Sequence, residues 1–253
     1  MLPKAKVVPC AYSQQVFETL ARGKVQAAVV PIENSLAGPV TEHYDLLLEH
    51  RCYIERELQM RIVHNMIAAP GVKLAQLRRV LSHPVALAQC RKLFQNYPKL
   101  TAEPFYDTAG AVKHILSEGS CEAAGIASTL AAKEYGGHIL KAGIEDNKAN
   151  FTRFILVRKL RGKKLPVARG ASKASLAFFL KNETGTLFRA LQAFAQAGIS
   201  LSKIESRPLS GKPWEYVFYV DVLSGDSAAF RRALANLQKA GAKARVLGVY
   251  STR

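Results

Sequence analysis

The sequence predicts an α/β protein with a smaller βαββαβ domain at its C-terminus. Strand-like and helix-like segments alternate over residues 1–158, a pattern typical of a parallel sheet covered by helices. A basic stretch without acidic residues follows, VRKLRGKKLPVARG at 157–170, and we interpret it as a solvated linker. Beyond it, four strand patterns alternate with two helical ones. These observations predict three regions: 1–158, a linker at 159–172, and a compact domain at 173–253.

Turn residues and the spacing of apolar residues predict where the helices and strands of the first region lie. Apolar residues at helical spacing predict helices, and apolar runs that end in Gly, Pro or small polar residues predict strands. Gly136-Gly137 is expected to close the last of these helices in a left-handed conformation. The predicted helices lie at 14–24, 41–50, 85–97, 111–119 and 129–135, with a further short helix beginning near Lys73 and a loop-rich segment at 101–110. One strand is predicted at 58–70, and the others end near 32, 82, 128 and 157.

In the last region, segments with the apolar period of strands alternate with segments with the apolar period of helices. Strand patterns lie at 173–182, 199–208, 213–225 and 242–252, and amphipathic helices at 183–198 and 227–241. Their order, βαββαβ, is that of a ferredoxin-like domain.

Composition narrows the class of protein. Apolar residues make up 49% of the chain, and no apolar run approaches the roughly 18 residues that span a bilayer. The four cysteines are far apart and form no CxxC pair, which argues against zinc or a disulfide framework and favours the cytoplasm. The net charge of +17 allows nucleic acid, an acidic membrane or an anionic small molecule as partner.

Polar side chains recur where predicted strands end. Glu33-Asn34-Ser35 lies in VVPIENSLAGPV, and Ser82-His83, Asp107-Thr108 and Ser128 occupy similar positions further on. Ligands of open α/β sheets bind outside the carboxyl ends of strands. The sequence therefore predicts one cleft, floored by the PIENS stretch, for a small anionic substrate.

A second polar stretch, Asn150-Phe151-Thr152-Arg153-Phe154, starts an apolar strand. It places a hydroxyl and a guanidinium together, and arginine is the preferred partner of a carboxylate. From the residues alone, an ordinary strand start explains it better.

Seven motifs that occur in one order favour a functional role for this stretch over an ordinary strand start: PIENSLAG, SHP, YDTAG, IAS, NFTRF, ESRP and GKPWEYVFYVD. Together they resemble the prephenate dehydratase family over nearly the whole chain. The resemblance implies a catalytic domain of two α/β subdomains, like a periplasmic binding protein, and a C-terminal ACT regulatory domain. It implies a lyase that converts prephenate to phenylpyruvate in phenylalanine biosynthesis, without metal or cofactor.

The resemblance also implies site residues, with the PIENS stretch facing the NFTRF stretch in one cleft. Thr152 would be the essential hydroxyl, hydrogen-bonded to the departing oxygen, and Arg153 would bind a carboxylate or orient its loop. Glu33 would orient neighbouring donors or, if burial raised its pKa, supply a proton; we favour the first. His83 is read chiefly as a structural hydrogen-bonding residue. The residues expected to contact substrate are Glu33, Asn34, Ser35, His83, Ser128, Arg153 and Phe154.

Two departures affect the catalytic half. Family members usually open with a strand and a glycine-rich turn, G-P-x-G-[TA]-[YF]-S, which is missing before VVPC here. A truncation is the preferred explanation, and the loss predicts a sheet that lacks one strand. Val85 stands where the family often has glutamine, which weakens the role of the SHP loop.

The ACT domain is expected to bind phenylalanine between two subunits of a homodimer or homotetramer. The helix-start motif and ESRP would supply the site: Gly185, Thr186, Leu187, Glu205, Ser206, Arg207 and Pro208. The segment 200–202 lacks the family's usual asparagine, so a domain that only dimerises stays an alternative.

Three other functions stay open. An arogenate dehydratase differs only in accepting the amino relative of prephenate. A non-catalytic phenylalanine sensor would keep the fold after losing its N-terminal wall. Nucleic-acid binding has least support, because no recognition motif accompanies the basic residues.

Overall fold

The computed structural model describes residues 5–162, 164–209, 215–225 and 227–252, so the beginning of the predicted GKPWEYVFYVD motif lies outside it. The chain forms two compact units. The first contains Met1–Glu33, Pro39–Gln59 and Arg153–Arg253, and the second contains Asn34–Gly38 and Met60–Thr152.

Two sheets build the first unit. One has the strand order β2-β1-β9-β3, with helices α1 and α2 beside it. Its elements are α1 Ser13–Ala21, β1 Ala28–Asn34, β2 Gly38–Pro39, α2 Thr41–Glu49, β3 Cys52–Arg61 and β9 Phe151–Lys159. The segment 5–10 forms neither helix nor strand.

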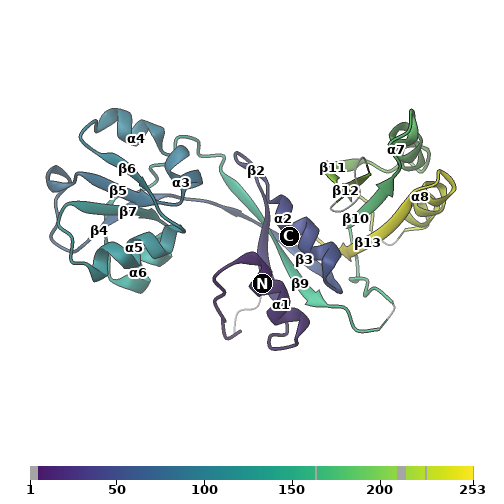
Figure 1. Cartoon of the computed structure of the whole chain (residues 1–253), viewed down its shortest axis with the longest axis horizontal. Coiled ribbons are helices and arrows are strands. Elements are labelled where there is room, and N and C mark those ends of the chain that lie inside the picture. Colours follow the sequence, from purple (N-terminus) through teal and green to yellow (C-terminus); the bar gives the residue numbers. More distant parts are fainter. Residues whose placement is uncertain (1–4, 163, 210–214, 226, 253) are drawn as a thin grey trace. The chain divides into compact units, whose positions relative to one another are not determined.

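The second sheet is the predicted βαββαβ domain, and its strand order is β11-β12-β10-β13. Helices α7 and α8 cover one face (Figure 1), where Phe178, Phe194 and Phe230 are buried. Its elements are β10 Lys173–Leu180, α7 Thr186–Gln196, β11 Leu201–Pro208, β12 Tyr216–Val222, α8 Ala228–Lys239 and β13 Lys243–Tyr250. The predicted α/β class and the C-terminal βαββαβ order are confirmed.

The other face of this sheet shares a hydrophobic core with the first sheet. Tyr219 and Leu247 lie in one cluster with Ile54 of β3. Gly248 permits this approach, because a Cβ there would come within 2.5 Å of the Ile54 carbonyl oxygen. The βαββαβ domain is therefore packed directly on strands β1, β9 and β3.

The second unit has a five-stranded sheet with the order β6-β5-β7-β4-β8. Strand β5 pairs in parallel with β6 and β7, as predicted, whereas β4 pairs antiparallel with β7 and β8. The elements are β4 Asn65–Ala68, β5 Arg79–Ser82, α3 Pro84–Ala88, α4 Arg91–Asn96, β6 Thr101–Pro104, α5 Thr108–Ser117, β7 Ala123–Ala127, α6 Thr129–Tyr135 and β8 His138–Lys141, with a 3-10 turn at Leu74–Gln76. Gly136 ends α6 with a positive φ, as expected.

Three element predictions were wrong. The strand predicted at 58–70 is two strands, β3 and β4, interrupted at 62–64, and the expected loop at 101–104 is β6. The helix predicted at 85–97 breaks at Gln89, whose carbonyl accepts a hydrogen bond from the Asp146 N–H (2.8 Å). The Asp146 carboxylate then accepts from the N–H groups of Arg91 and Lys92 and starts α4. Within the described chain, no helix is long and apolar enough to cross a membrane.

Candidate functional site

The PIENS and NFTRF stretches are joined by hydrogen bonds. Ser35 Oγ donates to the Ala149 carbonyl and accepts from the Phe151 N–H, both at 2.9 Å. The Ser35 N–H donates to the Phe151 carbonyl (2.8 Å). Two polar segments far apart in the sequence therefore meet at the end of β1, as the sequence predicts.

Asn34 is the centre of this junction. Its Oδ1 accepts from the N–H groups of Leu36 (3.0 Å) and Ala37 (2.8 Å), which folds the turn after β1. Its Nδ2 donates to Thr152 Oγ1 (2.9 Å) and Asn150 Oδ1 (2.8 Å). The turn thus fixes which way the amide points, and the amide points a donor at the Thr152 oxygen.

This contact determines what the Thr152 hydroxyl can do. A hydroxyl has one hydrogen to donate, and the Thr152 oxygen is already an acceptor. Among the described residues, its hydrogen has no hydrogen-bond acceptor. Thr152 is only 8% exposed, so little bulk water reaches its side chain. The Thr152 hydroxyl therefore keeps one hydrogen that no described protein group accepts.

Two further side chains complete the junction. Asn150 Nδ2 donates to Gln89 Oε1 (2.9 Å), and Gln89 Nε2 donates to Asn34 Oδ1 (3.3 Å). We call Asn34, Gln89, Asn150 and Thr152 the amide network. It carries no formal charge, and its three amides form a closed ring of hydrogen bonds.

His64 contacts the amide network through Gln89. Its Nε2 lies 2.9 Å from Gln89 Oε1, an atom that only accepts, so Nε2 carries the hydrogen. Its backbone N–H donates to Glu145 Oε2 (3.1 Å), and Arg61 pairs with Glu145 Oε1 at 3.0 Å. Burial opposes the charged form of Glu145, but backbone N–H groups and Lys148 outweigh it and lower the pKa of Glu145. The carboxylate therefore stays charged at neutral pH.

Sequence reasoning missed two members of this arrangement. The sequence predicts Gln89 inside an uninterrupted helix, and it assigns Asn150 no role. The break at Gln89 depends on Asp146, which is distant in sequence, so no local signal reveals it. The NFTRF stretch did signal Asn150, because its amide directly precedes the strand.

His83 and Ser128 have local partners. His83 Nδ1 accepts from the Val85 N–H (3.2 Å) at the start of α3, and Ser128 Oγ accepts from the Ala131 N–H (3.2 Å) at the start of α6. Neither has a hydrogen bond to Asn34 or Thr152 in the described chain. Phe154 is half-buried on β9.

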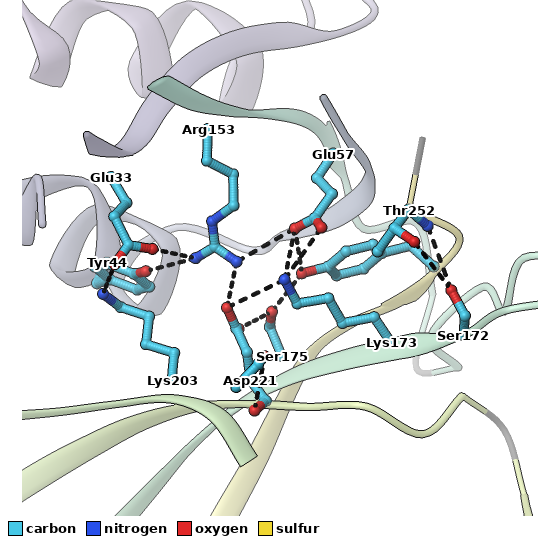
Figure 2. A network of polar contacts seen from close by, with 12 residues as sticks. Glu33, Tyr44, Glu57, Arg153, Ser172, Lys173, Ser175, Lys203, Asp221 and Thr252 are labelled. Carbon is cyan, nitrogen blue, oxygen red and sulfur yellow. Dashed lines mark hydrogen bonds and ion pairs between the residues drawn. The ribbon is translucent and has the colours of Figure 1, made fainter. Parts of the chain in front are cut away.

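Arg153 belongs to a different set of contacts, shown in Figure 2. Its guanidinium pairs with Asp221, with Glu57 Oε2 (3.2 Å) and with Glu33 Oε2 (3.4 Å), and donates to the Tyr44 hydroxyl. Burial alone would lower the pKa of Arg153, but Asp221 and the surrounding groups raise it overall. Arg153 is 8% exposed and holds a permanent charge.

The remaining cations balance these carboxylates. Lys173 Nζ lies 3.1 and 3.0 Å from the two oxygens of Glu57, and Lys203 Nζ lies 3.1 Å from Glu33 Oε1. We call the whole group the charged cluster: Glu33, Glu57, Arg153, Lys173, Lys203 and Asp221. Its three cations and three carboxylates balance in formal charge, and the terminal nitrogens of Arg153 are taken up by these partners, whereas its buried Nε has no hydrogen-bond partner among the described residues.

A cavity of about 510 Å³ lies at the start of α7. Four predicted effector residues line it: Gly185, Thr186, Leu187 and Ser206. Gly185 has φ +80°, and Phe218 of the neighbouring strand closes one side. The volume lies within the roughly 300–1,000 Å³ usual for small-molecule sites.

The other ESRP residues do not line this cavity. Arg207 pairs with Asp45 of α2, whose second oxygen accepts from the Tyr219 hydroxyl (2.9 Å). Exposure alternates along β11, which puts Glu205 and Arg207 on the opposite face from Ser206 and Pro208. ESRP therefore divides between the cavity and the contact with α2.

Comparisons with known proteins identify the family. The prephenate dehydratase family model matches residues 1–161, and the ACT domain model matches 174–229. Arogenate dehydratase/prephenate dehydratase 2 of Arabidopsis thaliana, a chloroplastic protein, is 41% identical over 98% of this chain and 67% of its own length. Arogenate dehydratase 2 of Petunia hybrida is 40% identical over 98% of this chain and 66% of its own. The chain thus spans about two thirds of these relatives.

Solved structures agree. The prephenate dehydratase of Arthrobacter aurescens in complex with L-Phe has a TM-score of 0.87 and 34% identity, covering 96% of this chain and 81% of that one. GqqA, described as a novel type of quorum quenching acylase, has a TM-score of 0.89 and 33% identity over 99% and 91%. With its ACT domain at the C-terminus, the chain belongs to the prephenate dehydratase family of lyases.

Proposed function

We propose that this chain converts prephenate to phenylpyruvate and that the amide network forms the reacting part of its site. The ring of prephenate becomes aromatic when hydroxide and carbon dioxide leave together. One proton is consumed, because the departing hydroxide ends as water. The enzyme must therefore stabilise a developing negative charge on one oxygen while it holds a dianion in place.

The free hydrogen of Thr152 is the observation that carries this proposal. Asn34 donates to the Thr152 oxygen, so the hydroxyl hydrogen is directed away from Asn34 and is available to the leaving group. A neutral threonine is too weak an acid to give up its proton fully. We assign it a hydrogen bond that strengthens as charge develops on the departing oxygen, with water or the solvent supplying the proton.

Arg153 and Glu33 take positioning roles in this proposal. The Arg153 guanidinium is paired with three carboxylates, which favours orientation of the NFTRF loop over direct contact with substrate. Glu33 is paired with Lys203 and Arg153, which favours its reading as an orienting acceptor. Asn34 uses both amide hydrogens on protein partners and holds Thr152 directly, and Gln89 acts through its hydrogen bonds to Asn34 and Asn150. His83, Ser128 and Phe154 stay proposed contacts, to be tested by substitution.

The chemistry of this site does not support an acylase activity like the one named for GqqA. Acyl transfer through a nucleophilic hydroxyl needs a base beside it to accept its proton. The neighbour of Thr152 is the Asn34 amide nitrogen, which donates and cannot accept.

The experiment compares wild type with Thr152→Ala and Thr152→Ser. We expect prephenate turnover in wild type, a fall in kcat of about 10²–10³-fold in Thr152→Ala, and recovery of most of it in Thr152→Ser. Unfolding midpoints show that each variant is folded. Equal kcat in wild type and Thr152→Ala would remove Thr152 from the mechanism, and an inactive wild type would favour a phenylalanine sensor.

Arogenate is the second candidate substrate, because the relative at 41% identity is named arogenate dehydratase/prephenate dehydratase 2 and the relative at 40% is named arogenate dehydratase 2. The two substrates differ only in a keto or amino group on the side chain. The ratio of kcat/KM for prephenate and arogenate decides between them, and a ratio above one supports the first reading.

We further propose that phenylalanine binds in the cavity at the start of α7 and that the chain pairs through its ACT domains. Calorimetry tests the first point and sedimentation the second. Substitution Ser206→Phe, which fills the cavity, is expected to abolish binding without loss of turnover. We also propose a reducing, cytoplasmic location, which the four unpaired cysteines support; the Arabidopsis relative is a chloroplastic protein.

A further inference from the structure

The chain passes between its two units at four peptide bonds. They are Glu33–Asn34, Gly38–Pro39, Gln59–Met60 and Thr152–Arg153. Two of these bonds join the charged cluster directly to the amide network: Glu33 precedes Asn34, and Thr152 precedes Arg153. Both Asn34 and Thr152 are thus one peptide bond from a residue held by ion pairs.

Residues of the ACT sheet hold both of these neighbours. Asp221 on β12 pairs with the Arg153 guanidinium, and Lys203 on β11 pairs with Glu33 Oε1 at 3.1 Å. Figure 2 shows Arg153 between Glu33 and Glu57, with Asp221 facing it from the ACT sheet. Two ACT side chains therefore contact the residues that adjoin Asn34 and Thr152 in the sequence.

These ACT side chains are themselves firmly placed. Asp221 is 2% exposed and also accepts a hydrogen bond from Ser175 Oγ on the adjacent strand β10. Ser175 Oγ lies 2.6 Å from the Tyr250 hydroxyl of β13. The carboxylate of Asp221 on β12 is thus linked by hydrogen bonds to strands β10 and β13 of the ACT sheet.

The same two strands also line the effector cavity. Strand β11 carries Ser206 at the cavity and Lys203 at the charged cluster, and β12 carries Phe218 at the cavity and Asp221 at the cluster. On each strand the two residues are three positions apart. They project to opposite faces of the sheet, since side chains alternate.

We propose that Asp221 and Lys203 are positioning residues of the dehydratase site, and that strands β11 and β12 carry the state of the effector cavity through them to Thr152 and Asn34. This inference rests on the function proposed above. A ligand in the cavity shifts β11 and β12, and the ion pairs of Lys203 and Asp221 shift with these strands. Through the peptide bonds Glu33–Asn34 and Thr152–Arg153, this shift changes the direction of the Asn34 amide and of the Thr152 hydroxyl that it supports. Asp221 and Lys203 need no contact with substrate.

The test uses Asp221→Asn, Lys203→Met and a control, Arg245→Met. Arg245 on β13 also joins the ACT sheet to the rest of its unit, through the carbonyls of Leu48 and His50, but it touches no neighbour of the site. We expect Asp221→Asn and Lys203→Met to lower kcat at least tenfold with a small change in KM, to keep phenylalanine binding by calorimetry, and to lose most phenylalanine inhibition. Arg245→Met is expected to keep kcat and inhibition.

A double variant separates positioning from general destabilisation. If Asp221 acts through Arg153, then Arg153→Gln combined with Asp221→Asn has the kcat of the worse single variant. If the two residues act independently, the losses multiply, and the inference is wrong.

Hydrogen exchange gives a readout that does not depend on activity. In wild type, phenylalanine should change exchange in peptides that cover 33–36 and 149–153, and in Lys203→Met it should not. Bound phenylalanine without any change in wild type, or an unchanged response in Lys203→Met, overturns the inference. An inactive wild type that shows the exchange response contradicts the proposed function and leaves the coupling supported.

Discussion

The amide network and the charged cluster are adjacent in sequence and opposite in chemistry. The amide network is neutral, its amides satisfy one another, and one hydroxyl hydrogen is left to donate. The charged cluster contains three cations and three carboxylates whose formal charges balance, and within it the Arg153 Nε is buried without a hydrogen-bond partner among the described residues. The difference teaches that a motif such as Thr152-Arg153 can divide its roles between neighbouring residues. The neutral Thr152 keeps a hydroxyl hydrogen without a protein acceptor, whereas the charge of Arg153 is matched by carboxylates.

The largest expected effect separates the two groups by stability. Arg153→Met leaves the buried Asp221 and Glu57 with Lys173 as their remaining cation among the described residues, and breaking a buried ion pair costs about 3–5 kcal/mol. Urea denaturation measures the loss. The control is Arg22→Met, which removes an exposed ion pair with Glu18 and should cost less than about 1 kcal/mol. Equal losses in the two variants would show that the charged cluster does not stabilise the fold.

The second prediction concerns catalysis by the amide network. Asn34→Asp keeps the shape of the side chain but replaces a donor with a carboxylate. The Thr152 hydroxyl then donates to the introduced carboxylate instead of to the leaving group, so kcat should fall about 10²-fold with a modest change in stability. Steady-state kinetics and an unfolding midpoint for the same preparation measure the two effects.

Asn147→Asp is the matched control for charge. Asn147 is exposed in the same loop as Asn150, and its Oδ1 accepts only the Ala149 N–H among described contacts, a role that a carboxylate can keep. It should retain nearly all activity. A similar loss in both variants would assign the effect to added negative charge rather than to the orientation of the Thr152 hydroxyl.

The third prediction concerns Glu145, the buried carboxylate that accepts a hydrogen bond from the backbone N–H of His64. The pKa of Glu145 is lower in the folded state than in the unfolded chain, so its contribution to stability is present above its ordinary pKa and is lost as pH falls through the folded value. Glu145→Gln should therefore cost about 1.5–3 kcal/mol at pH 7 and progressively less under acid.

Denaturation of wild type and Glu145→Gln across this pH range checks the sign. Glu103→Gln, which alters an exposed pair with Arg79 in the same unit, is the control and should show little dependence on pH. A difference that grows as pH falls would contradict the stabilising role of the Glu145 charge.

Sequence patterns predicted the part of this structure that depends on local signals. The βαββαβ order follows from periodicity, and the end of α6 follows from Gly136. The meeting of Ser35 with the NFTRF stretch followed from polar residues at strand ends together with the family resemblance.

Long-range partners explain what could not be predicted. Gln89 leaves its helix for partners in the loop before β9, and Asn34 and Asn150 are 116 positions apart. The burial of Arg153 depends on Asp221, 68 positions later and in another domain. An arginine beside a catalytic hydroxyl looks like a substrate ligand until its carboxylate partners are known.

The smallest expected effect uses two thiols as reporters of the two units. Cys52 lies in the core of the first unit and Cys90 in that of the second, and burial raises the pKa of each to about 12. Both should resist alkylation in the native wild type, whereas the exposed Cys121 reacts. In Arg153→Met, which weakens the charged cluster of the first unit, labelling of Cys52 should rise by a larger factor than labelling of Cys90. Mass spectrometry of labelled peptides at low denaturant gives both rates. Equal acceleration would mean that the units open together, and the contrast between the amide network and the charged cluster would then be one of chemistry but not of local stability.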